Sequence, residues 1–260
     1  MKKKHGKGRL STKLLTIVFL CVFLFSMYKV VSILLEYHSI DKLYDETSQT
    51  YTVENEAASE EAQDKPIEVN FEELSRLNKD VIGWIYIPDT NVSFPLLQGS
   101  SNKQYLYQSY KKEYLTAGSI FLDYRCDAEF KDKSTVIYGH NMHNGSMFGS
   151  LKKYKAASYM KEHPYIYILK QNGEWNKYEI SAFYQASVDG PTYMLPIKSE
   201  DKKSFRELID TINADNIYSE AEAQEIKETD KLIILSTCTQ DSRDDIRVTI
   251  AARLTDNDVN

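Results

Sequence analysis

A run of 22 mostly apolar residues, Leu14 to Leu35, is the feature that most constrains how this chain can fold. As a helix it would be about 33 Å long, enough to cross the hydrocarbon core of a membrane. The 13 residues before it carry six Lys and Arg and no acid. This asymmetry predicts a cytoplasmic N-terminus and an extracellular C-terminal bulk. A cleaved signal peptide is the alternative, but the run is long for one and no small-x-small site follows it closely.

We therefore predict a basic cytoplasmic tail over 1–13 and a single transmembrane anchor over 14–35. Residues 36–67 hold nine Asp and Glu against two Lys and few large apolar side chains, which is typical of a solvated extracellular stalk. The folded domain is expected over 68–260. Without the first 13 residues the chain has 26 basic and 38 acidic residues, a net charge of −12, which argues against nucleic acid as its partner.

The pattern of the folded domain predicts a mainly β architecture, most simply a closed or nearly closed barrel with flanking helices. Asn70 is placed to cap an N-terminal helix through FEELSRLNKD, and a second helix is predicted over Ser204–Ile212. Short apolar, β-branched runs elsewhere predict strands, with Asn172-Gly173 as a hairpin turn. The strand runs are GWIYI, VSFPLLQ, SIFLD, STVIY, YIYILK, WNKYEISAFYQAS, LIIL and the stretch from Ile246 to Leu254.

The last two predicted strands bring a thiol close to a cation. The buried run Leu232–Leu235 leads to Cys238, and the returning strand opens at Arg247. If the two strands pair as a hairpin, the guanidinium lies near the thiol, and a neighbouring cation lowers the pKa of a cysteine and favours the nucleophilic thiolate. A salt bridge from Arg247 to Asp244 or Asp245 is the alternative use of that arginine.

A thiol nucleophile also needs a proton carrier, and His140 is the candidate. It follows Gly139 at the end of the strand STVIY. One imidazole can accept the proton of the thiol and later donate it to a leaving amine, because its pKa lies near neutrality. A lone histidine at a strand end is more often structural, so His140 gains weight only beside Cys238 and Arg247.

The cysteines have two alternative uses, a disulfide and a zinc site. A disulfide between Cys126 and Cys238 is the structural alternative in an exported domain, but it would consume the thiol that the other residues surround. A zinc site from His140, His143 and Cys238 lacks a fourth ligand with convincing spacing. No metal and no cofactor are expected.

Four stretches of this sequence resemble class B sortases over essentially all of Asn70–Leu254. The sortase signature Thr-Leu-x-Thr-Cys falls on Ile234-Leu235-Ser236-Thr237-Cys238, with Ile in place of the first Thr. The other stretches are NxDVIGWIxIPxTxVxxPLLQ at 78–98, GSIFLDYR at 118–125 and IYGHNMxxGSMFxxL at 137–151. The predicted helix before the cysteine strand and the N-terminal membrane anchor are also similar to the class B arrangement.

The resemblance implies a closed sortase barrel and a role for five residues. Cys238 would be the nucleophile, His140 the general acid and base, and Arg247 the residue that stabilises substrate and oxyanion, with Arg243 as its fallback. Ser236 and Thr237 would line the substrate pocket.

The implied reaction is transpeptidation without a cofactor. A C-terminal sorting signal, Asn-Pro-x-Thr-like in class B, would be cleaved after Thr through a thioester, and an amine of a peptidoglycan precursor would then receive the surface protein. A pilin-polymerising sortase, a hydrolytic cysteine peptidase and a catalytically inert wall-binding module remain as alternatives. The order His, Cys, Arg excludes a papain-like arrangement, in which Cys comes first.

Overall fold

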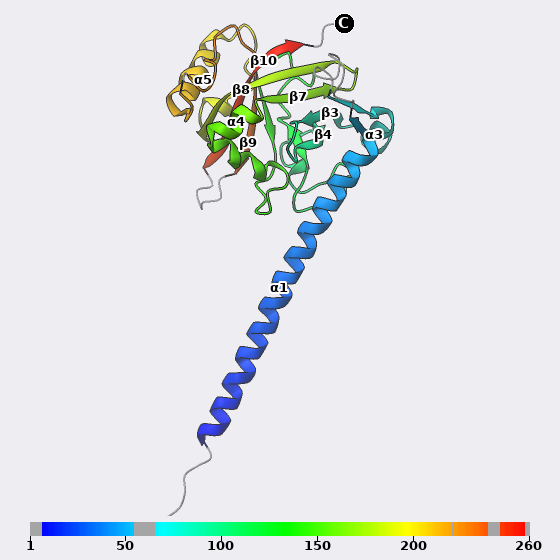
Figure 1. Cartoon of the computed structure of the whole chain (residues 1–260), viewed down its shortest axis with the longest axis vertical. Coiled ribbons are helices and arrows are strands. Elements are labelled where there is room, and N and C mark those ends of the chain that lie inside the picture. Colours follow the sequence, from blue (N-terminus) through cyan, green and yellow to red (C-terminus); the bar gives the residue numbers. More distant parts are fainter. Residues whose placement is uncertain (1–6, 55–65, 220, 239–244, 258–260) are drawn as a thin grey trace, which may run out of the picture. The chain divides into compact units, whose positions relative to one another are not determined.

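A computed structural model describes residues 7–54, 66–219, 221–238 and 245–257 of the chain (Figure 1). These residues form two compact units, Met1–Leu43 and Tyr44–Asn260. The second unit therefore begins well before residue 68, where the sequence predicted the folded domain to start. Part of the predicted stalk, residues 55–65, lies outside the described residues.

The helices and strands alternate irregularly along the chain. The helices, with three short 3-10 helices written η, are α1 (Lys7–Tyr51), α3 (Phe71–Leu77), η1 (Gln104–Leu106), η2 (Phe148–Lys155), α4 (Ala157–Glu162), η3 (Pro191–Tyr193) and α5 (Lys202–Asp215). The strands are β1 (Thr52–Glu54), β2 (Ile67–Val69), β3 (Val81–Tyr86), β4 (Ser93–Leu97), β5 (Ile120–Leu122), β6 (Ser134–Tyr138), β7 (Tyr165–Lys170), β8 (Trp175–Ser187), β9 (Leu232–Cys238) and β10 (Ile246–Asn257).

Eight of the strands close into a barrel, in the order β10-β8-β7-β3-β4-β5-β6-β9. Two neighbouring pairs, β4 with β5 and β6 with β9, run parallel, and the other pairs are antiparallel. Closure leaves none of these strands with an unpaired edge. The closed barrel with flanking helices confirms the predicted fold class.

Burial on both faces of the barrel wall explains why several strands read as apolar runs in the sequence. Trp84, Ile137, Ile234 and Ile250 are fully buried, each on a different strand. In β6 and β9 every described side chain up to Tyr138 and Thr237 is buried or nearly so, because these central strands are covered on both faces.

Helix α3 begins after Asn70, as the sequence predicts, and α5 begins at Lys202, two residues before the predicted start at Ser204. The Asn70 side chain accepts a hydrogen bond from the backbone N–H of Glu73 and caps α3, and Asp201 caps α5 in the same way through Ser204. The apolar face of α5 is buried against the barrel beside β8 (Figure 1). Between β6 and β7 the chain forms η2 and then α4, with Ala156 extended between them.

Helix α1 contributes to both compact units. In the first unit its apolar side chains from Leu14 to Leu35 are exposed, and its length and hydropathy suffice to cross a membrane. In the second unit its last turns are part of the fold. Tyr44 is buried and its hydroxyl donates to the Gly118 carbonyl at 2.5 Å, while Thr47 donates to the Tyr110 hydroxyl at 3.0 Å.

Candidate active site

The parallel pairing of β6 and β9 aligns the ends of the two strands that lead to His140 and Cys238. Tyr138 is the Cα partner of Ser236, and the Gly139 N–H donates to the Ser236 carbonyl at 3.2 Å. Each predicted residue lies two positions beyond this matched pair. Parallel strands present their C-terminal ends at the same edge of a sheet. His140 and Cys238, nearly a hundred residues apart in sequence, therefore follow the ends of two adjacent strands.

The antiparallel strand β10 brings the third residue to the same edge. Arg247 is the Cα partner of Cys238, and Thr249 is the partner of Ser236. Residues directly opposite each other are the closest cross-strand neighbours in an antiparallel pair. The register therefore confirms the predicted hairpin and brings the backbones of Cys238 and Arg247 together.

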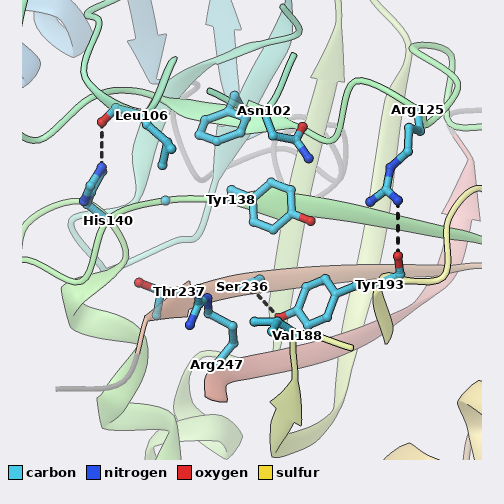
Figure 2. A pocket seen from close by; sticks show the side chains of 12 residues that line it. Asn102, Leu106, Arg125, Tyr138, His140, Val188, Tyr193, Ser236, Thr237 and Arg247 are labelled. Carbon is cyan, nitrogen blue, oxygen red and sulfur yellow. Dashed lines mark hydrogen bonds between the residues drawn. The ribbon is translucent and has the colours of Figure 1, made fainter. Parts of the chain in front are cut away.

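A pocket of about 360 Å³ opens at this edge of the barrel (Figure 2). Four of the predicted residues line it, namely His140, Ser236, Thr237 and Arg247. The other lining residues are Asn102, Leu106, Phe121, Arg125, Tyr138, Gly139, Val188 and Tyr193.

The His140 imidazole is held by the segment that contains η1. Its Nε2 lies 2.6 Å from the Leu106 carbonyl oxygen (Figure 2), and the Tyr107 ring packs against it with centroids 5.5 Å apart. Because a carbonyl only accepts, Nε2 carries the proton in the neutral ring and Nδ1 is the basic nitrogen. Burial disfavours the charged ring and lowers the pKa of His140, although the hydrogen bond to Leu106 opposes this shift.

Arg247 is half-buried, and one of its Nη1 hydrogens is donated to the carbonyl of Ile246 at 3.0 Å. Of the two acids that compete for it in the sequence, Asp244 lies outside the described residues, as does the fallback Arg243. The Asp245 carbonyl accepts a hydrogen bond from the Val188 N–H at 2.9 Å, which ties the end of the loop to the end of β8.

The two residues before Cys238 differ in how their hydroxyls are used. The Ser236 hydroxyl is 2.7 Å from the Tyr193 hydroxyl (Figure 2). The Thr237 Oγ1 is buried and has no hydrogen-bond partner among the described residues.

A buried polar cluster behind the pocket was not predicted from the sequence. The Asp123 carboxylate is fully buried and accepts hydrogen bonds from Arg125, Asn102 and Tyr138, all three of which line the pocket. Asp123 and Arg125 lie in the GSIFLDYR stretch, so a signal was present. The sequence did not predict their role, because their partners Asn102 and Tyr138 are not adjacent to them in sequence. Tyr193, in the short helix η3, is farther still.

Cys126 has no part in this site. It is a free, buried cysteine, so this structure does not contain the alternative disulfide with Cys238. Burial raises the pKa of its thiol to about 12, so the thiolate is scarce at neutral pH. His143, the other residue of the zinc alternative, is exposed on the loop after β6.

The sequence and structure comparisons all match this chain to one group of proteins. Residues 85–255 match the sequence family described as the sortase domain. Sortase B of Listeria monocytogenes is 36% identical over 227 residues, which cover 87% of this chain and 89% of the relative. Among solved structures, sortase B from Bacillus anthracis superposes with a TM-score of 0.69 at 27% identity, covering 85% of this chain and 99% of that one. The solved sortase B from Listeria monocytogenes gives 0.60 at 35% identity, covering 71% and 100%.

Proposed function

Because the chain belongs to the sortase family, and within it to sortase B, a group of cysteine transpeptidases, we propose the following reaction for it. The enzyme cleaves a C-terminal sorting signal of the Asn-Pro-x-Thr type after its Thr and transfers the surface protein to an amine of a peptidoglycan precursor. One observation carries the assignment of the site. The register pairs Cys238 with Arg247, beside the strand that delivers His140, at the edge where the pocket opens.

In the acylation step the Cys238 sulfur attacks the carbonyl carbon of the Thr, and the thiol proton passes to Nδ1 of His140. The peptide C–N bond then breaks, and the departing amine takes the proton from His140. The product is a thioester on Cys238. A neutral imidazole is required at the start, which agrees with the lowered pKa of His140.

In the second step an amine attacks the thioester carbonyl, gives its proton to His140 and displaces the Cys238 thiolate, which is then reprotonated. Both steps pass through an oxyanion. The Arg247 guanidinium is the proposed stabiliser of that charge. Ser236 and Thr237 are proposed to contact the sorting signal, and the unpaired Thr237 hydroxyl supports that role.

The location follows from the first unit of the chain. We propose that α1 crosses the cell membrane once, with the basic residues before it in the cytoplasm and the barrel outside. This places the pocket on the side of the membrane where surface proteins and wall precursors meet.

The test is a fluorogenic Asn-Pro-x-Thr peptide incubated with the purified full chain, with and without hydroxylamine. We expect a hydroxamate product that increases with amine concentration and disappears in Cys238→Ala. The matched control is Cys126→Ala, which removes a buried thiol that does not line the pocket and should not change turnover.

Each other outcome would identify a rival function. Cleavage at the same rate with and without amine would indicate a hydrolytic peptidase. Transfer to a lysine-containing pilin peptide in preference to wall-precursor amines would indicate a pilin polymerase. Peptidoglycan binding without any turnover would indicate an inert wall-binding module.

A further inference from the structure

One carboxylate organises the polar wall of the pocket. Asp123 Oδ1 accepts from the backbone N–H of Arg125 at 3.0 Å and from its Nε at 2.8 Å. Oδ2 accepts from Arg125 Nη2 at 2.7 Å, Asn102 Nδ2 at 2.8 Å and the Tyr138 hydroxyl at 3.0 Å. All five donors converge on a side chain with no exposed surface.

Arg125 extends this cluster across the pocket to the cysteine strand. Its Nη1 donates to the Tyr193 carbonyl at 3.3 Å, and the Tyr193 hydroxyl meets Ser236 (Figure 2). The Tyr193 and Tyr138 rings are stacked, with centroids 6.3 Å apart and planes 13° from parallel. Asp123 thus fixes Tyr138 directly and Tyr193 through Arg125.

The ion pair is arranged with its cation toward the pocket. The Arg125 side chain is 32% exposed and lines the pocket, whereas the Asp123 side chain is 0% exposed behind it. A guanidinium at a pocket wall attracts acidic ligands unless a close anion compensates it. The bidentate contact with Asp123 supplies that compensation, so the pair offers N–H donors and adds no net charge to a pocket that Arg247 also lines.

We propose that the Asp123–Arg125 pair is the device that sets the specificity of this pocket for an uncharged sorting signal. Asp123 is a positioning residue, because it acts through Arg125, Asn102 and Tyr138. This inference rests on the proposed function for the identity of the ligand, and on the geometry above for the charge.

The charge argument predicts opposite effects for substitutions at the two ends of the pair. Asp123→Asn keeps the shape of the side chain but leaves Arg125 without its compensating charge. Arg125→Gln removes the cation instead. Only the first change turns the pocket wall positive, so only the first should favour an acidic ligand.

The experiment uses the full chain and a parent Asn-Pro-x-Thr peptide. Matched peptides replace each position before the Thr by Asp in turn. In Asp123→Asn we expect the kcat/KM of at least one acidic peptide, relative to the parent, to rise about tenfold over wild type, through KM. In Arg125→Gln no acidic peptide should gain, and Arg125→Lys should retain the wild-type order of preference.

The matched control is Asp132→Asn. Asp132 is also buried and lies in the same β5–β6 connection as Asp123. It is also paired, at 2.6 Å, with a cation, Lys198 of the segment between η3 and α5, but neither residue lines the pocket. Its loss should cost stability without changing the peptide ratios. Equal ratios in Asp123→Asn and wild type, or a gain in Asp132→Asn as large as that in Asp123→Asn, would overturn the proposal.

Binding of the same peptides to Cys238→Ala proteins, followed by NMR, separates this inference from the proposed function. Absence of turnover in wild type would contradict the proposed reaction, while the ratio of peptide affinities would still report the charge of the pocket. If Asp123→Asn fails to fold, the pair Arg125→Gln and Arg125→Lys decides. A gain in the relative affinity of acidic peptides in Arg125→Gln, or a changed order of preference in Arg125→Lys, would then reject the role of the ion pair.

Discussion

At the scale of single residues, the burial of His140 predicts how activity will depend on pH if this residue is the proton carrier, as proposed. Burial lowers the pKa of the ring below its ordinary value of 6.5, so the neutral form persists to lower pH than in a solvated histidine. In the pH window below 6.5 the unfolded chain binds the proton more readily than the folded one. His140 therefore makes the fold less stable as the pH falls through that window.

We expect the acid limb of the kcat/KM profile to lie below pH 6.5. Tyr107 covers the imidazole and is not assigned a catalytic role, so Tyr107→Ala should admit water and move that limb upward. A pH–rate series on the two proteins, with an NMR titration of the His140 ring, checks both statements. A wild-type limb above pH 6.5 would contradict the assigned environment.

The proposed contact between Arg247 and the oxyanion predicts that activity depends on this side chain. Removing one donor to an oxyanion typically reduces turnover by about 10²–10³-fold. We expect Arg247→Ala to lose activity by this order while the fold persists in circular dichroism. Arg253→Ala is the matched control, because Arg253 lies on the same strand and pairs with Glu179 instead of lining the pocket. Activity of Arg247→Ala within a few-fold of wild type would remove the arginine from the mechanism.

At the scale of elements, the sequence predicted the barrel strands well but did not show that the last turns of α1 pack in the second unit. Buried strands of a barrel leave continuous β-branched runs, and these marked β6 and β9 without knowledge of their partners. The last turns of α1 lie in an acidic, polar stretch that resembles a stalk. Their packing depends on Tyr44 and Tyr51, whose partners Phe94 and Tyr110 are far along the chain. No local pattern reports such contacts.

The buried last turns of α1 predict that the folded unit includes Tyr44 and the residues that follow it. A chain starting at residue 39 retains Tyr44, Thr47 and Tyr51 and should melt at the temperature of the full chain. A chain starting at residue 66 loses them. Deleting a large buried aromatic side chain costs about 3–5 kcal/mol, and each kcal/mol lowers the Tm of a domain this size by about 2–4 °C. Equal Tm values for the two shortened chains would show that residue 68 is the true boundary.

The candidate site divides in the same way into what local sequence shows and what it does not. Cys238, His140 and Arg247 could be proposed because each stands at a strand end that the pattern exposes. Asn102 and Tyr193 lie in loops, and their places depend on Asp123 and Arg125. Such hydrogen-bond partners are fixed by the closure of the barrel, which pairs residues without regard to their separation in sequence.

At the scale of the whole molecule, the chain joins an apolar helix to a folded domain with an excess of acidic residues. The basic residues are concentrated before the helix, and the remainder has a net charge of −12. The polar wall of the pocket is nonetheless built around a balanced ion pair. Overall charge bears on the solubility and orientation of the chain, whereas the proposed ligand preference depends on the Asp123–Arg125 pair alone.

The parallel contact between β6 and β9 also has a consequence for the timing of synthesis. A ribosome makes β6 early and the pair β9 and β10 last, and the barrel closes only when β10 has met both β8 and β9. If Cys238, His140 and Arg247 act together as proposed, the site is assembled only after β9 and β10 have joined the strand that leads to His140.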